Sequence, residues 1–161
     1  MFNKFGEFNS YEELNEAAAG LKEEGDEAAL LELAEENGID REEAEDYLDG
    51  CVDELCNCSM AALGKIAVES KELEVYEIME DWIDYIKIQC IENEDMARAV
   101  RKSGKTIKNC IAELLKWSFK HQYKVPDEVI KAAGVSGGKC TLGIPGMRRA
   151  KDIIRKYYLE G

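Results

Sequence analysis

Proline is scarce in this chain, which has Pro126 and Pro145 among its 161 residues. Because proline interrupts helices, a chain so poor in it favours long helices, as do its many alanine, leucine, glutamate and lysine residues. No apolar run approaches the roughly 20 residues that a membrane-spanning helix needs. The first residues, which include Lys4 and Glu7, lack the apolar stretch of a signal peptide. We therefore expect a cytoplasmic, mainly α protein that has no membrane partner.

Residues for metal binding are also scarce. His121 is the one histidine, and it lies far along the chain from the cluster Cys51, Cys56 and Cys58. Zinc sites prefer tight cysteine pairs such as C-x2-C, whereas the spacing here is C-x4-C-x-C. We therefore predict that no metal binds, and that the six cysteines are free thiols in a reducing compartment.

A glycine-rich segment, residues 134–146, contains an incomplete phosphate-binding motif. The P-loop pattern requires its first glycine at the position of Ala133 and a serine or threonine at the position of Cys140. Neither requirement is met, and the preceding segment is predicted to be a helix rather than a strand. We therefore expect a flexible turn here, with no cofactor. No nucleophile–base pair stands out either, so we predict that the chain is not an enzyme.

Acidic side chains outnumber basic ones, and the two kinds are unevenly distributed along the chain. The net charge is −13. Residues 1–60 hold 19 acidic and 3 basic side chains, residues 61–100 hold 10 and 4, and residues 101–161 hold 5 and 14. The local net charges are therefore −16, −6 and +9. This polarity favours electrostatic association with a partner.

Apolar side chains recur at three- and four-residue spacing, which predicts a bundle of helices. The expected helices begin near residues 10, 26, 40, 60, 73, 93, 106, 126 and 145. Ser10 and Glu13 form a capping box at the first of these helices. The apolar inner face of the third helix reaches Leu55. Whether residues 140–144 form a short strand is left open.

The sharpest change of composition falls near Arg98. It predicts an acidic helical subdomain at residues 1–94, packed with a basic helical subdomain at residues 95–161 that includes the loop 134–146. The aromatic residues Tyr76, Trp82, Trp117 and Phe119 are expected in the core rather than on a binding surface.

The acidic half contains a helical hairpin pattern at residues 33–48. Gly38 makes the turn, and Ile39, Ala44 and Leu48 close the core. A hairpin that reads DNA needs a basic second helix, so we expect no tight binding of duplex DNA here. One interpretation is a plain hairpin in a bundle; the other is an acidic surface that occupies a basic, nucleic-acid-binding groove of another protein. The candidate contacts are Glu35, Glu36, Asp40, Glu42, Glu43, Glu45 and Asp46.

The end of the chain offers an alternative contact face. The expected last helix has a continuous basic side, and with Tyr157 and Tyr158 it suits phosphates or an acidic protein surface. The same bases could instead neutralise the acidic half of the same molecule or of a second copy, so a homodimer is left open. The basic residues are Arg148, Arg149, Lys151, Arg155 and Lys156.

From Asp95 onward, the order of features resembles a known family. Asp95-Met-Ala-Arg-Ala-Val precedes Lys105-Thr-Ile-Lys-Asn-Cys110, an apolar helix, Val125-Pro-Asp-Glu, and a helix that ends in Lys156-Tyr-Tyr. This order is similar to that of PcfK-like proteins, small proteins of conjugative and phage-like elements of Firmicutes. The opening Met1-Phe-Asn-Lys-Phe-Gly-Glu-Phe8 also resembles acidic proteins of such elements. The glycine-rich insert and the acidic half have no counterpart in the pattern.

The resemblance implies an accessory protein of a mobile element, and some PcfK-like proteins are anti-CRISPR inhibitors of RNA-guided nucleases. Our first hypothesis is therefore a binder that inhibits a nucleic-acid-handling protein, in its most specific form a CRISPR effector nuclease, through the acidic surface. The alternative is a conjugation or plasmid-maintenance accessory protein that contacts DNA or a partner through its basic last helix.

Overall fold

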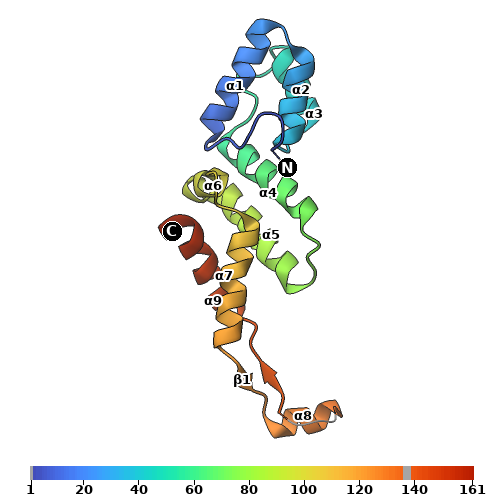
Figure 1. Ribbon diagram of the computed structural model, residues 1–161, viewed down its shortest axis with the longest axis vertical. Coiled ribbons are helices and arrows are strands. Elements are labelled where there is room, and N and C mark those ends of the chain that lie inside the picture. The colour runs from blue at the N-terminus through green and yellow to red at the C-terminus, as the bar shows by residue number, and fades with distance from the viewer. Residues whose placement is uncertain (1, 136–138) are drawn as a thin grey trace.

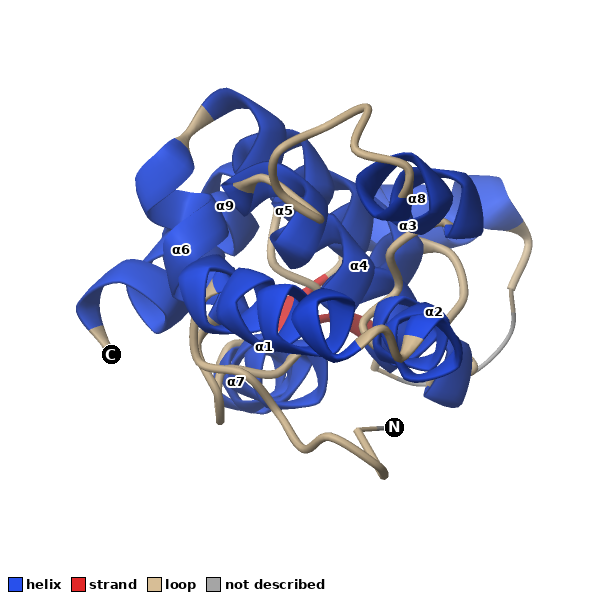
Figure 2. Ribbon diagram, turned by 90° about the horizontal axis from the view of Figure 1, so that it is seen from above, coloured by secondary structure: helices blue, strands red, loops and turns tan. Residues whose placement is uncertain are grey.

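The computed structural model describes residues 2–135 and 139–161, and it forms a helical bundle, as predicted. The bundle is drawn out along one axis, with the N-terminal helices at one end and a hairpin at the other (Figure 1). Seen from above, helices make up most of the described chain, and loops and one short strand pair make up the rest (Figure 2). The helices are α1 Tyr11–Glu24, α2 Glu27–Glu36, α3 Arg41–Leu48, α4 Cys58–Glu72, α5 Ile78–Glu92, α6 Glu94–Arg101, α7 Ile107–Lys120, α8 Asp127–Ala133, α9 Met147–Arg155 and the π-helix η1 Lys156–Glu160.

Two hydrophobic cores lie along the bundle, and α4 contributes to both. The first core joins α1, α2, α3 and the start of α4, where Ala61 is buried. The second joins Cys58, Ala62 and Ile66 of α4 with α5, α6, α7, α9 and η1. The expected boundary between residues 94 and 95 falls at the start of α6, inside the second core. The two cores therefore meet along α4 rather than near Arg98.

The helix starts follow from capping residues. Ser10 Oγ accepts the Glu13 amide at 3.2 Å, and the Glu13 carboxylate accepts the Asn9 amide at 2.8 Å, so the first helix begins where the capping pattern predicts. Asp26 caps α2 and Thr106 caps α7 in the same way, through bonds of 3.1 and 3.2 Å to amides three residues later. Such caps satisfy amides that have no partner within the helix.

Two predicted helix boundaries are wrong. α3 ends at Leu48 instead of continuing to Leu55, because Gly50 adopts a left-handed φ of 77° just beyond the helix. Leu55 still reaches the first core, but from a loop. α5 begins at Ile78 rather than near residue 73, because Glu77 interrupts the helical backbone with a φ of 55°.

A hairpin arm projects from the end of α7 (Figure 1). Strand β1, Tyr123–Lys124, pairs antiparallel with β2, Thr141–Leu142, so the short strand left open by the sequence at residues 140–144 is present. Between the strands, the residues of α8 are exposed or half-buried. The central part of the expected glycine-rich turn, residues 136–138, lies outside the described residues.

A buried polar cluster joins the two cores. Lys65 on α4 is fully buried, and its Nζ donates to two carbonyls of the α6–α7 loop at 2.6 and 2.9 Å and pairs with Glu7 at 2.9 Å. Arg101 on α6 donates to the side-chain oxygen of Asn37, at the end of α2, at 2.7 Å. Because a buried charge without partners is costly, these contacts fix how the first core sits on the second.

Candidate binding surfaces

The α2–α3 turn packs directly on α4 through two glycines. Gly38 has a left-handed φ of 68°, and a Cβ there would lie 2.3 Å from the carbonyl oxygen of Gly64. A Cβ on Gly64 would in turn lie 2.3 Å from the carbonyl oxygen of Asn37. Since real side chains tolerate neither distance, this close approach requires glycine at both positions. It holds the acidic helices α2 and α3 close above α4.

A groove lined by carboxylates lies between α2, α3 and α4. Its volume is about 620 Å³, and it adjoins a hollow of about 290 Å³ with which it shares Ile39, Asp40 and Ala67. Glu35 lines the larger part and Glu43 the smaller part, while Asp40 lines both. We call these two hollows together the acidic groove. Two basic side chains, Arg41 and Lys71, also line it.

The structure separates the seven predicted acidic contacts into two groups. Glu36 is half-buried, and its carboxylate accepts the amides of Lys4 and Phe5 at 3.0 and 3.4 Å, so it anchors the N-terminal segment. Glu45 accepts a hydrogen bond from Arg41 Nε at 2.7 Å. Within the described residues, no hydrogen bond or ion pair engages the other five carboxylates, which remain free for a partner. These are Glu35, Asp40, Glu42, Glu43 and Asp46.

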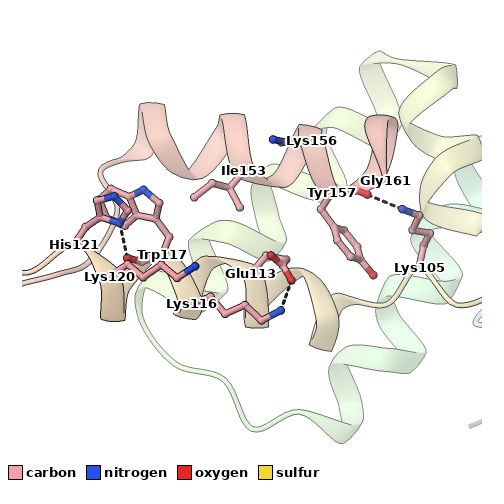
Figure 3. Close-up of a pocket in the computed structure, with 10 residues that line it drawn as sticks. All are labelled: Lys105, Glu113, Lys116, Trp117, Lys120, His121, Ile153, Lys156, Tyr157 and Gly161. Atoms are coloured by element: carbon pink, nitrogen blue, oxygen red, sulfur yellow. Dashed lines mark hydrogen bonds and ion pairs between the residues drawn. The ribbon is translucent and has the colours of Figure 1, made fainter.

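A second groove lies at the basic end of the molecule, between α7 and α9 (Figure 3). Its volume is about 560 Å³, and Trp117, His121, Ile153 and Tyr157 form its walls. We call it the basic groove. It is also lined by one acid, Glu113, and by four lysines, Lys105, Lys116, Lys120 and Lys156.

The aromatic walls of the basic groove are held in place by local contacts. Trp117 and His121, one turn apart, stack with ring centroids 4.3 Å apart and an interplanar angle of 10°. His121 Nδ1 also lies 2.8 Å from the carbonyl oxygen of Trp117. Across the groove, the Tyr157 hydroxyl accepts the Thr106 amide at 3.0 Å, and burial raises the pKa of Tyr157, so this phenol stays neutral.

Two of the groove lysines already have partners and two are free. Lys105 donates to the carbonyl of Tyr157 at 2.7 Å, and Lys116 pairs with Glu113 at 2.6 Å. Among the residues that the structure describes, none forms a hydrogen bond or ion pair with Lys120 or Lys156. These two exposed ammonium groups are therefore available to an anionic ligand.

Four of the bases predicted on the last helix lie on α9, and the fifth, Lys156, is the first residue of η1. Arg149 approaches the Trp117 ring at 6.0 Å and Lys156 lines the basic groove, so both face α7. Lys151 lies 5.2 Å from the ring of Tyr85 on α5. All five predicted bases are exposed: Arg148, Arg149, Lys151, Arg155 and Lys156.

Several residues of the basic groove are not predicted by the sequence. Trp117 is expected in the core, but it is half-buried and forms a groove wall. The assignment of Phe119 and Tyr76 to the core is wrong, since they are 78% and 64% exposed, whereas Trp82 is buried as predicted. One signal is present: Lys116 with Lys120 and Trp117 with His121 share a spacing of four residues, which places each pair on one helix face.

Comparison with protein-family models, curated proteins and solved structures finds no match to this chain. The resemblance to PcfK-like proteins therefore rests on its motifs alone and stays a prediction. In the fold, these motifs fall on α6, the start of α7, the hairpin arm and η1.

In the described chain, the cysteines form no disulfide and join no metal-binding cluster. The six cysteines are unpaired; Cys56, Cys58, Cys90 and Cys110 are buried and Cys51 is exposed. Within residues 2–135 and 139–161, no three histidine, cysteine, aspartate or glutamate side chains gather in a way that could hold a metal ion. Across the same residues, no helix combines the length and apolar character that a membrane span requires.

Proposed function

We propose that this chain is a binding protein that inhibits a nucleic-acid-handling protein by placing its acidic groove against a basic surface of that protein. The observation that carries the proposal is the set of three unpaired carboxylates, those of Glu35, Asp40 and Glu43, around a groove that also contains Ile39 and Ala67. Neighbouring carboxylates repel one another until a cationic partner neutralises them. The apolar part of the groove adds buried area on binding.

In its most specific form, the proposed partner is an RNA-guided nuclease. Such nucleases hold nucleic acid in positively charged channels, which an acidic surface complements. Glu42 and Asp46, exposed on α3 beside the groove, extend the negative surface. The resemblance to PcfK-like proteins, some of which are anti-CRISPR proteins, supports this choice among nucleic-acid-handling proteins.

Charge reversal tests the acidic groove directly. The groove variant carries Glu35→Lys, Asp40→Lys and Glu43→Lys, and the control carries Glu16→Lys, Glu23→Lys and Glu24→Lys on exposed positions of α1. Both variants change the net charge equally. We expect the wild type and the control to inhibit target cleavage by a Firmicutes RNA-guided nuclease, and the groove variant to bind at least roughly tenfold more weakly. Binding of the wild type should also weaken steeply with added salt.

Two outcomes contradict the proposal at different levels. If no RNA-guided nuclease is inhibited by the wild type, the anti-CRISPR assignment fails. If the groove variant binds an identified partner as tightly as the control does, the acidic groove is not the contact surface. Circular dichroism of both variants establishes that they are folded, which the exposed or half-buried positions of the three groove residues lead us to expect.

The exposed bases of α9 favour a second function, that of a conjugation or plasmid-maintenance accessory protein that contacts DNA or a partner. A mobility-shift assay at physiological salt separates the two functions, because we expect no tight binding of duplex DNA by a chain with a net charge of −13. Submicromolar duplex affinity that disappears in an Arg148→Ala, Arg155→Ala variant would favour the second function instead.

A further inference from the structure

The basic groove combines an apolar interior with an unpaired cationic rim. The parallel Trp117–His121 stack and Ile153 provide apolar surface, while Lys120 and Lys156 extend from α7 and from the start of η1 (Figure 3). The volume of about 560 Å³ lies within the range of small-molecule sites, roughly 300–1,000 Å³. A ligand that fits must therefore present both a compact apolar group and negative charge.

We propose that the basic groove binds single-stranded nucleic acid, one base at a time. The base lies in the groove against the wall formed by Trp117, His121 and Ile153, and the phosphates on either side of it contact Lys120 and Lys156. Stacking of bases on aromatic side chains, together with a basic track for the backbone, is how proteins hold single strands without reading their sequence. The site is separate from the acidic groove, so this proposal does not depend on the proposed function.

The geometry favours a single strand over the other anionic ligands. In a duplex, each base is stacked and paired, so it cannot enter a groove unless it is flipped out at a cost in free energy. An acidic protein surface supplies negative charge, but its carboxylate side chains carry no flat apolar group for the groove interior. A nucleotide of a single strand supplies both.

Glu113, the acidic residue that lines the basic groove, allows a second test of the same site. Glu113 pairs with Lys116 at 2.6 Å and places a negative charge beside the expected phosphates. Glu113→Gln removes this charge and frees Lys116 for the ligand. We therefore expect Glu113→Gln to strengthen binding by a few-fold, an effect that a merely destabilised protein would not show.

The experiment measures binding of the full chain to a labelled oligothymidylate by fluorescence anisotropy. The oligonucleotide has about 12 nucleotides, which is within the range of single-strand site sizes. The salt concentration is about 50 mM, where electrostatic binding is strong. The groove variant is Lys120→Glu with Lys156→Glu, and the control is Lys108→Glu with Lys131→Glu, exposed lysines outside the groove. We expect micromolar binding by the wild type and at least roughly tenfold weaker binding by the groove variant. The control should stay within about threefold of the wild type. The slope of log affinity against log salt is negative, and its magnitude should fall by about 0.7 for each phosphate that the groove variant no longer neutralises.

A third variant tests the contact with the base. Trp117→Leu removes the indole from the groove wall without changing charge, and we expect it to weaken binding by roughly tenfold, since stacking contributes on that order per base. The fluorescence of Trp117 should also change on binding, while Trp82, buried in the second core, should not respond.

The proposal is overturned by any of three results. These are no oligonucleotide binding at about 50 mM salt, a duplex of the same length bound as tightly as the single strand, or equal weakening in the groove and control variants. Thymidine monophosphate that competes as well as the oligonucleotide would support the site and identify a free nucleotide as its ligand. The acidic-groove variant should not weaken oligonucleotide binding, so the two proposals fail independently.

Discussion

Two glycines decide how closely the α2–α3 turn approaches α4. Gly38 is recognisable in the sequence, because it follows an apolar helical pattern where a left-handed turn residue is expected. Gly64 is not, because a glycine in the middle of a helix pattern normally only weakens the helix. In the fold it is the backbone of Asn37 and Gly38 that leaves no room for a side chain at Gly64. The acidic groove therefore depends on Gly64, although the local sequence does not indicate that a glycine is required there.

Gly64→Ala should destabilise the protein despite the higher helix propensity of alanine. The new Cβ would lie 2.3 Å from the carbonyl oxygen of Asn37, so α2 and α4 must separate, at a cost of roughly 1–3 kcal/mol. The control is Gly20→Ala in α1, where a Cβ meets nothing within 4 Å; we expect it to stabilise by about 0.5–1 kcal/mol. Urea denaturation of both variants measures the difference. Equal effects in the two would contradict the close backbone approach.

At the scale of elements, N-cap bonding distinguishes acids that stabilise a helix from acids that remain available to a partner. Asp26 and Asp40 occupy the same position, the N-cap of α2 and of α3. Asp26 accepts the Ala29 amide at 3.1 Å, whereas Asp40 makes no side-chain cap bond and lines the acidic groove instead. Both read as capping residues in the sequence, so local pattern alone does not separate them.

The two caps should therefore differ in their contribution to stability. Asp26→Ala should lower the free energy of unfolding by about 1 kcal/mol, the usual cost of removing a cap bond. Asp40→Ala should lower the free energy of unfolding by only about 0.3 kcal/mol, because it removes only the interaction of the carboxylate with the helix dipole. It should also weaken partner binding. Thermal unfolding compares the two variants directly. A loss of stability in Asp40→Ala as large as in Asp26→Ala would place that carboxylate in the fold rather than in the proposed binding surface.

The same difference between local and tertiary information appears along the other helices. The helix expected to begin near residue 106 is found at Ile107–Lys120, because the Thr106 cap and its apolar period are both local signals. The same period places Phe119 in the core, yet it is exposed, because no element of the described chain packs on that side of α7. Periodicity identifies an apolar face but not what covers it.

At the scale of the whole molecule, the shared helix α4 and the cluster around Lys65 couple the two cores. Both cores contain buried thiols: Cys56 lies in the first core, and Cys90 and Cys110 lie in the second. Burial raises the pKa of each of these three thiols to about 12, so they remain thiols, which react poorly, near neutral pH. Cys51 is exposed.

Thiol labelling near pH 8 should therefore give two phases, because only exposed thiols are accessible in the folded protein. Cys51 should react at once, whereas Cys56, Cys90 and Cys110 should react together and only as the protein unfolds, since opening of α4 disrupts both cores. Denatured protein should show all six thiols, and elemental analysis should find no zinc. Fewer than six thiols or stoichiometric zinc would contradict the free-cysteine prediction. Much faster labelling of Cys56 than of Cys90 would show that the cores open separately.

The α class, the positions of most helices and the separation of charge follow from the sequence, because each of these depends on residues that are neighbours along the chain. Which carboxylates are engaged and which are free depends on the packing, since Glu36 meets its partners Lys4 and Phe5, which lie 32 and 31 positions away in the sequence. The basic groove likewise joins Trp117 to Tyr157, which lie 40 positions apart in the sequence. Binding surfaces of this kind form when helices pack, and helix periodicity specifies an inward face without specifying the helix that meets it.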